Sequence, residues 1–198
     1  MVKSILIVGV GGQGTILMSK ILTKGLVSLG YDVKMSEIHG MSQRGGSVTT
    51  QIKYSTADGE AGGGSVNAPN ISEGEADIIV SFEKIEALRA LPFLKKNGVI
   101  ITDDREIFPM PVLTGAAVYP HDAIEELGRL CPGLKVIKAA EIAENLGSVR
   151  AQNIVLLGAL IRELGLEDAD WKALVTGEVP PKALDVNLAA LEKGAGLV

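Results

Sequence analysis

Hydrophobic positions at the start of the chain predict a strand, a helix and a second strand. Residues 4–8 are a serine and four aliphatic residues with glycines directly behind them, which is typical of a strand buried on both faces. Between residues 17 and 29, leucine and isoleucine recur at helical spacing, and Gly30 then ends the predicted helix. Residues 31–37 form the next predicted strand. This strand–helix–strand unit predicts a right-handed crossover between parallel strands.

A different kind of strand is predicted at residues 47–54. From Val48 to Tyr54, every second position carries an apolar residue or threonine and the positions between are polar, which indicates a strand with one buried face. Residues 38–46 are the only connection to the preceding strand, and they are too few for the crossover that a parallel pair requires. We therefore expect this strand to run antiparallel to the second strand, within a mixed sheet.

The remainder of the chain predicts further strands and helices and no second domain. A surface loop is expected over residues 57–70, and a mostly irregular segment over 105–120. Further strands are expected at 76–82, 99–102 and 135–138, and helices at 82–94, 121–130, 139–146, 149–164 and in a tail from about 181. Residues 1–198 thus predict one α/β domain, a three-layer α/β/α sandwich around a mostly parallel, Rossmann-like sheet with at least one antiparallel strand.

Composition and charge remove several functional classes. The 198 residues include 24 glycines but only one tryptophan, three tyrosines and three phenylalanines, so the core must be aliphatic. The net charge of −5 argues against nucleic acid as a partner, because phosphate backbones require a basic surface. The longest uncharged apolar run, 154–161, is too short to span a membrane, and the N-terminus lacks the features of a signal peptide. We therefore expect a cytoplasmic protein.

A glycine-rich motif follows the first strand and opens the first helix. Gly9, Gly11 and Gly14 match the G-x-G-x-x-G pattern, with Gly12 and Gln13 at its variable positions. Such a loop can present the free N–H groups of a helix N-terminus to an anion, but the same glycines can serve strand–helix packing alone. Glu37 ends the second strand, where a dinucleotide fold places its ribose-binding carboxylate. Since no helix follows that strand, a hydride-transferring dehydrogenase is the weaker hypothesis.

The loop after the second strand combines three kinds of polar side chain. Glu37, His39 and Arg44 bring a carboxylate, an imidazole and a guanidinium to the expected carboxyl edge of the sheet, where open α/β folds bind ligands. The guanidinium is suited to a carboxylate or phosphate, and Gly45 and Gly46 would let a ligand come close. A tight turn braced by an Arg44–Glu37 pair is the structural alternative.

No catalytic residue and no metal site is predicted elsewhere. The two histidines are too far apart for metal-ligand spacing, and His121 is expected at the start of a helix. Asp103 and Asp104 could bind a cation but more commonly cap the next turn. Cys131, the only cysteine, excludes an internal disulfide and a cysteine-ligated cluster within this chain alone. Asn153 is expected to be a hydrogen-bonded amide in a buried helix.

Together the glycine motif and the loop containing Arg44 resemble the gamma-type component of the 2-oxoacid:ferredoxin oxidoreductases. The stretch 36–48 is similar in more detail to the beta subunit of the indolepyruvate:ferredoxin oxidoreductases, as are 73–77, 82–94 and 153–160. The resemblance extends from residue 3 to about residue 165. It implies one gamma-type domain over residues 1–198, with the helical tail as its less similar part.

The resemblance also implies a division of labour within a larger enzyme. The complete enzyme would oxidatively decarboxylate an aryl 2-oxoacid on thiamine diphosphate, pass electrons through [4Fe–4S] clusters to ferredoxin, and transfer the acyl group to CoA. This chain has one cysteine and no thiamine motif, so a larger partner subunit would hold those cofactors. The chain would be inactive alone and would dock and shape the CoA and substrate cleft; a homodimer is a further option.

Two matters stay open at this stage. A stand-alone nucleotide-binding or NAD-binding Rossmann-like protein is the alternative to the subunit hypothesis, and it predicts binding of such a ligand by the isolated chain. Residues 57–70 depart from the family pattern, which has a more apolar segment there. Because enzymes for pyruvate, ketoisovalerate and 2-oxoglutarate share the same plan, the oxoacid is not determined, nor is the stoichiometry of the complex.

Overall fold

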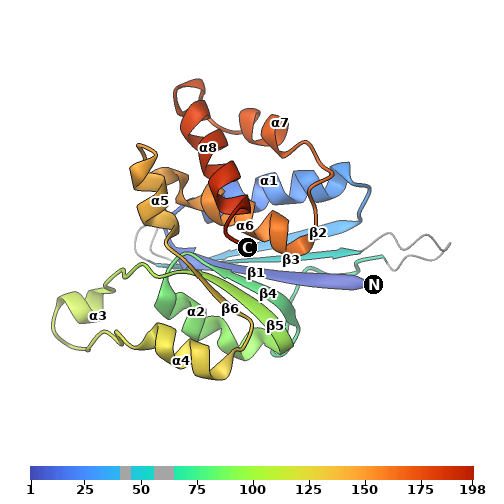
Figure 1. Ribbon diagram of the computed structural model, residues 1–198. Coiled ribbons are helices and arrows are strands. Elements are labelled where there is room, and N and C mark those ends of the chain that lie inside the picture. Colours follow the sequence, from blue (N-terminus) through green and yellow to red (C-terminus); the bar gives the residue numbers. More distant parts are fainter. Residues whose placement is uncertain (41–45, 56–64) are drawn as a thin grey trace.

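The computed structural model describes residues 1–40, 46–55 and 65–198, which fold around a six-stranded mixed sheet (Figure 1). The strand order is β2-β3-β1-β4-β5-β6. β3 is antiparallel to both β2 and β1, whereas β1, β4, β5 and β6 are mutually parallel. The strands are β1 (Val2–Val10), β2 (Val33–His39), β3 (Ser47–Ser55), β4 (Ala76–Ser81), β5 (Leu94–Asp103) and β6 (Leu134–Ile137). The predicted fold class, including the antiparallel strand at 47–54, is confirmed.

Insertion of β3 modifies the predicted strand–helix–strand unit. β2 runs parallel to β1, as expected, but it pairs with β3 and not with β1. The crossover through α1 (Thr15–Ser28) therefore passes over one intervening strand. β3 pairs on both sides and buries alternate residues, which accounts for its period of two.

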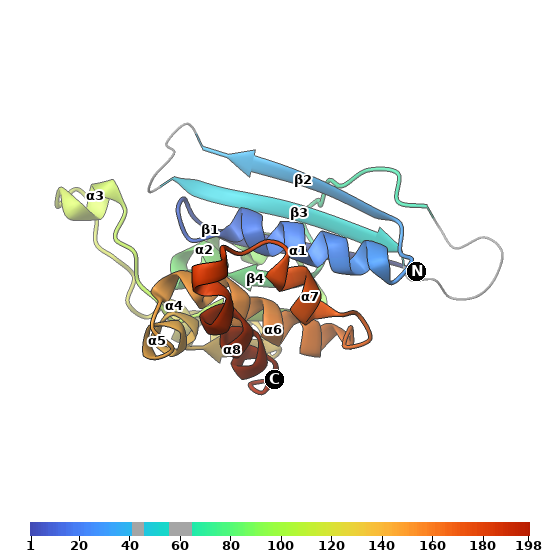
Figure 2. The ribbon, with the colours of Figure 1, turned by 90° about the horizontal axis from the view of Figure 1, so that it is seen from above.

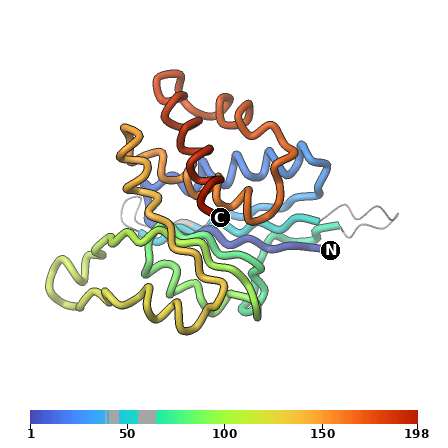
Figure 3. The backbone as a smooth tube through the Cα atoms, in the orientation of Figure 1, coloured from blue at the N-terminus to red at the C-terminus, as the bar shows by residue number. Residues whose placement is uncertain are grey.

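Helices cover both faces of the sheet, as the tube in Figure 3 shows most clearly. α1 lies on one face with α5, α6, α7 and α8, while α2 and α4 lie on the opposite face (Figure 1). The bounds are α2 (Lys84–Ala90), α4 (Ala123–Leu130), α5 (Ala139–Asn145), α6 (Gln152–Leu164), α7 (Trp171–Thr176) and α8 (Leu184–Ala195). The short 3-10 turns are Leu91–Phe93, Val149–Ala151 and Pro181–Ala183. The predicted three-layer arrangement is confirmed.

The central strand β1 is buried on both faces, which explains its continuous apolar run. Ile5 and Ile7 pack into the larger core, beneath α1 and α6. Leu6 and Val8 point the other way into a smaller core with residues of α2 and α4. Successive side chains of a strand alternate between faces, so a strand between two helical layers must be apolar at both.

Burial within the chain also accounts for the apolar circumference of α6. Every residue from Gln152 to Ile161 is buried, between the sheet, α1, α5 and α8. An interface with a second copy is therefore not needed to cover this helix. Within the described ranges, no helix is both long and apolar enough to cross a lipid bilayer.

Three local predictions were wrong. The helix expected to reach residue 94 ends at Ala90, because Pro92 lacks an N–H and disfavours helix before it; β5 then begins at Leu94 and not at 99. α7 was not expected at all. The segment 105–120 is mostly irregular, as expected, apart from the short helix α3 (Met110–Leu113), which projects from the body in Figure 2. Part of the loop expected over 57–70 lies outside the described residues, and 65–70 has no regular structure.

Candidate functional site

The carboxyl ends of β1 and β4 form the switch point of the sheet. These parallel neighbours are followed by helices on opposite faces, α1 after β1 and α2 after β4. Open α/β sheets bind ligands in the crevice that such a divergence leaves. Two adjoining cavities lie there, of about 560 Å³ beside the glycine loop and about 580 Å³ beside α2, and both are lined by Val10 and Ile107.

The glycine loop combines packing and ligand-accessible positions. A Cβ at Gly9 would lie 3.0 Å from Phe82 Cβ, and one at Gly14 would lie 2.7 Å from Asn153 Nδ2, so close packing favours glycine at both positions. Gly12 has a φ of 100° and open space where a Cβ would lie. Gly14 is the N-cap of α1, and no side chain caps this end of the helix. Strand–helix packing therefore explains Gly9 and Gly14, whereas Gly12 is the position that a ligand can approach.

Gln13 acts as a clamp between β1 and the end of β4. Its Oε1 accepts a hydrogen bond from Val10 N at 2.7 Å, and its Nε2 donates to Phe82 O at 2.9 Å. Gln152 Nε2 donates to the same carbonyl at 3.0 Å. Gln13 still lines the cavity, but its amide is occupied in holding the loop.

Arg105 and Arg150 supply positive charge to the glycine-loop cavity. Arg105 follows β5 and donates through Nη1 to Gln152 Oε1 at 3.3 Å, while Arg150 lies in the turn before α6. Both line the cavity, and none of the described residues lining it is acidic. Neither arginine was predicted from the sequence, although Arg105 follows the carboxyl end of β5, where ligands are expected. The cavity suits an anion.

Asn153 places a polar atom without a protein partner in the same wall. Its Nδ2 donates to Gly14 O at 3.2 Å, which fixes the orientation of the amide. Its Oδ1 is buried and has no hydrogen-bond partner among the described residues. The expectation of a fully hydrogen-bonded amide is therefore wrong for this oxygen.

Asp103 holds Gln152, one of the residues that line the glycine-loop cavity. Its Oδ2 accepts hydrogen bonds from Ala140 N at 2.8 Å, at the start of α5, and from Gln152 Nε2 at 2.7 Å. Burial raises the pKa of Asp103 to about 7. A cap on the turn directly after β5 was expected, whereas this carboxylate accepts a backbone N–H from the start of α5, far along the chain.

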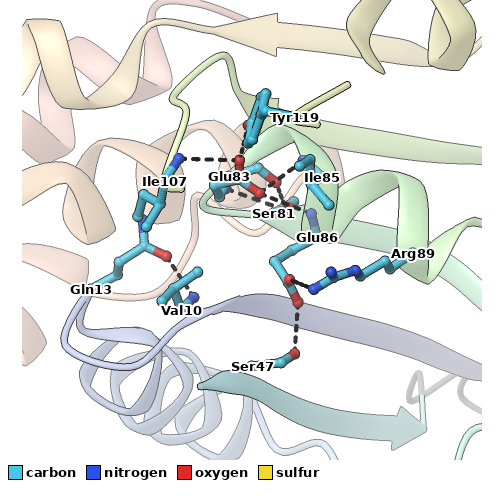
Figure 4. A network of polar contacts seen from close by, with 10 residues as sticks. All are labelled: Val10, Gln13, Ser47, Ser81, Glu83, Ile85, Glu86, Arg89, Ile107 and Tyr119. Atoms are coloured by element: carbon cyan, nitrogen blue, oxygen red, sulfur yellow. Dashed lines mark hydrogen bonds and ion pairs between the residues drawn. The ribbon is translucent and has the colours of Figure 1, made fainter. Parts of the chain in front are cut away.

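Two carboxylates, Glu83 and Glu86, line the second cavity. Figure 4 shows their polar contacts. Glu83 caps α2, with Oε2 accepting from Ile85 N at 2.8 Å and Glu86 N at 3.0 Å. Its Oε1 accepts from Ile107 N at 3.3 Å and from the Tyr119 hydroxyl. Burial and this carboxylate raise the pKa of Tyr119, so its hydroxyl remains a donor. Glu83 thus connects α2 to the segment that carries α3.

Glu86 lies at the side of the same cavity that adjoins β3. Its Oε2 accepts from Ser47 Oγ and its Oε1 from Arg89 Nη1, both at 2.6 Å (Figure 4). A second link holds the α3 segment, since Lys84 pairs with Glu106 and donates to His121 O at 3.0 Å. His121 directly precedes the N-cap of α4, as predicted.

The residues predicted as ligands in and beside the loop after β2 do not all lie at the glycine-loop cavity. Gly46 O accepts from Gly11 N at 2.9 Å, so the end of this loop meets the glycine loop. Glu37 accepts from Ser19 Oγ at 3.3 Å and does not line the glycine-loop cavity, because β3 separates β2 from β1. Arg44 and Gly45 lie outside the described residues, and so does the proposed pair of Arg44 with Glu37.

Comparison with known proteins gives a consistent assignment. The family model for pyruvate ferredoxin/flavodoxin oxidoreductase matches residues 4–197. The chain is 38% identical to indolepyruvate oxidoreductase subunit IorB of Pyrococcus horikoshii, covering 96% of this chain and 93% of that protein. It is 39% identical to subunit IorB of Archaeoglobus fulgidus, covering 96% and 92%.

A solved structure shares the fold. The keto/oxoacid ferredoxin oxidoreductase gamma subunit from Geobacter sulfurreducens superposes with a TM-score of 0.67 at 19% identity, covering 100% of this chain and 96% of that one. These relatives are oxidoreductase subunits, which does not support the alternative of a stand-alone NAD-binding protein. The chain belongs to the pyruvate ferredoxin/flavodoxin oxidoreductase family, as one of its small subunits.

Proposed function

We propose that this chain is the small, non-catalytic subunit of an indolepyruvate-type 2-oxoacid:ferredoxin oxidoreductase, and that its glycine-loop cavity binds the phosphates of CoA. The complete enzyme oxidatively decarboxylates an aryl 2-oxoacid to acyl-CoA and passes the electrons to ferredoxin. The substrate class is supported by the two IorB relatives described above. The cytoplasm is the compartment that goes with this role.

One observation carries the assignment of CoA to this cavity. Arg105, Arg150 and the uncapped N-terminus of α1 converge on one space of about 560 Å³ whose described lining contains no carboxylate. Backbone N–H groups at a helix N-terminus and guanidinium groups are the protein's best donors for phosphate oxygens. Gly12 lets the ligand approach the backbone. Gly11 and Gln13 form the framework that holds the glycine loop at this side of the cavity.

The redox cofactors belong to a larger partner subunit in this proposal. A [4Fe–4S] cluster takes four cysteine thiolates, and Cys131 is the one cysteine of this chain and is buried. The residues present do not fit a cluster. The described residues also contain no group of three or more His, Cys, Asp or Glu side chains that could hold a metal ion. We therefore assign thiamine diphosphate and the clusters to the partner, and docking and cleft shaping to this chain.

The test replaces one guanidinium in the assembled enzyme. Arg150→Ala should raise the KM for CoA about tenfold, because it removes a charge-assisted contact to phosphate. The kcat and the KM for the oxoacid should change little. Arg44→Ala tests, in the same assay, the guanidinium that the sequence predicted as a ligand of CoA. Lys172→Ala is the matched control, since Lys172 is an exposed cation that pairs with Glu192 on α8.

Assembly is measured beside the kinetics by gel filtration with the partner subunit. A CoA KM that stays at the wild-type value in both arginine variants, with the complex intact, would refute the role of the cavity. If a variant no longer co-elutes with the partner subunit, the arginine that it replaces contributes to docking instead.

A further inference from the structure

The second cavity at the switch point has a chemistry unlike the first. Its outer wall is apolar and is formed by the segment that carries α3, including Phe108, Met110 and Leu113. These side chains are 44%, 70% and 65% exposed, although they face a space of about 580 Å³. Large exposed apolar side chains around a cavity indicate a surface that a ligand or partner covers.

Hydrogen-bond capacity distinguishes the two carboxylates in this cavity. An ionised carboxylate offers about four acceptor positions. Glu83 accepts from four donors, three backbone N–H groups and the Tyr119 hydroxyl, so folding uses its full capacity. Glu86 accepts from Ser47 and Arg89 and retains acceptor positions, although it is only 6% exposed. A buried carboxylate with spare acceptors favours a ligand that brings an N–H donor.

Two groups in this cavity offer flat surfaces beside that acceptor. The Phe108 ring is held edge-on by the Tyr119 ring, with centroids 5.0 Å apart, and Tyr119 is itself fixed by Glu83. The Arg89 guanidinium is oriented by its hydrogen bond to Glu86 (Figure 4). Aromatic rings stack on both kinds of surface.

We propose that this cavity binds a planar aromatic ring bearing an N–H donor, with Phe108 and Arg89 contacting the ring and Glu86 accepting from its N–H group. The two cavities adjoin through Val10 and Ile107, so a single ligand can place an anion in the first and a ring in the second. Two ligands of the proposed enzyme carry such a ring, CoA through its adenine and the oxoacid through its indole. The choice between these sources rests on the proposed function; the requirement for a ring with an N–H group does not.

The experiment uses the enzyme assembled with its partner subunit. The KM for CoA, the KM for indolepyruvate, and the inhibition constants of 3′,5′-ADP and inorganic pyrophosphate are measured for Phe108→Ala, Phe108→Leu and Glu86→Gln. Adenine binding predicts that Phe108→Ala raises the CoA KM and the 3′,5′-ADP inhibition constant about tenfold, the size expected for one base-stacking contact. Glu86→Gln should raise both constants as well, because it replaces a charged acceptor by a neutral one. Pyrophosphate, which has no ring, should inhibit as before. Phe108→Leu keeps the apolar volume and should show a smaller effect.

Indole binding predicts a different pattern, in which the same variants raise the KM for indolepyruvate and leave CoA and 3′,5′-ADP unaffected. Val118→Ser is the matched control, because Val118 is 91% exposed on the same segment and does not line the cavity. Assembled Phe108→Ala and Glu86→Gln enzymes with all four constants unchanged would overturn the inference. Arg150→Ala tests the proposed function separately, since only that variant should weaken inhibition by pyrophosphate.

Discussion

The carbonyl of Phe82 shows how single side chains hold the site in place. It accepts hydrogen bonds from both Gln13 and Gln152, which lie far apart in the sequence. Gln152 in turn contacts Asp103 and Arg105. One row of hydrogen bonds therefore connects the glycine loop to the end of β5. Such a network positions donors before a ligand arrives, which reduces the cost of ordering them on binding.

Asp103 makes the stability of this network depend on pH. Its pKa is raised by burial to about 7 in the folded protein, above the ordinary value of 3.8. Between these values the folded state holds a proton that the unfolded state has released, so the free energy of unfolding falls as the pH rises from about 4 to 7. Asp103→Asn should remove this contribution. The free energy of unfolding of the variant, taken relative to that of the wild type, should rise by at least about 1 kcal/mol between pH 5 and pH 8.

Urea denaturation at several pH values measures this prediction. Asp168→Asn is the control, because Asp168 is exposed, and its curve should run parallel to that of the wild type. Parallel curves for Asp103→Asn as well would show that Asp103 titrates normally.

At the scale of elements, the crossing of α6 and α8 depends on two glycines. A Cβ at Gly158 would lie 2.3 Å from Leu191 O, and one at Gly194 would lie 2.0 Å from Val155 O. The two backbones are in direct contact there, and a side chain on either residue would separate the helices. This contact keeps α6 buried, and with it the position of Gln152 and Asn153 at the glycine loop.

Gly158→Ala should therefore destabilise the protein by about 2 kcal/mol or more, through overpacking between the helices. Gly128→Ala is the matched control in α4, because the nearest atom to its Cβ would be 3.9 Å away. That variant should be neutral or slightly stabilising, since alanine favours helix. Thermal unfolding of the two variants compares them directly, and equal melting temperatures would contradict the close contact of the backbones.

At the scale of the whole molecule, the proposed division of labour leaves this chain without redox chemistry of its own. The purified chain should be colourless and should not oxidise indolepyruvate in the presence of CoA and ferredoxin. Pull-down from the native source should recover a larger polypeptide with the visible absorbance of iron–sulfur clusters. Oxoacid oxidation by the isolated chain would refute the subunit hypothesis. Light scattering of the isolated chain measures whether it forms a homodimer.

Much of the fold was predictable because it depends on local pattern. The continuous apolar run of β1, the alternation of β3 and the short connection before it specify a mixed sheet without tertiary information. The errors have local causes as well. Pro92 ends α2 earlier than the apolar spacing suggested, and α7 is too short to show a helical period.

The site was only half predictable, and the reason is physical. The glycine motif and the loop ending at Gly46 are contiguous segments with recognisable composition, and β1–β3 pairing brings them together. Arg105, Arg150 and Asn153 reach the same cavity from the end of β5 and the start of α6. Their spacing in the sequence does not predict that these three residues line one cavity, because their proximity depends on how α6 packs across the sheet. The sequence by itself determined the order and type of most elements, whereas only tertiary packing decided which charges surround the cavity.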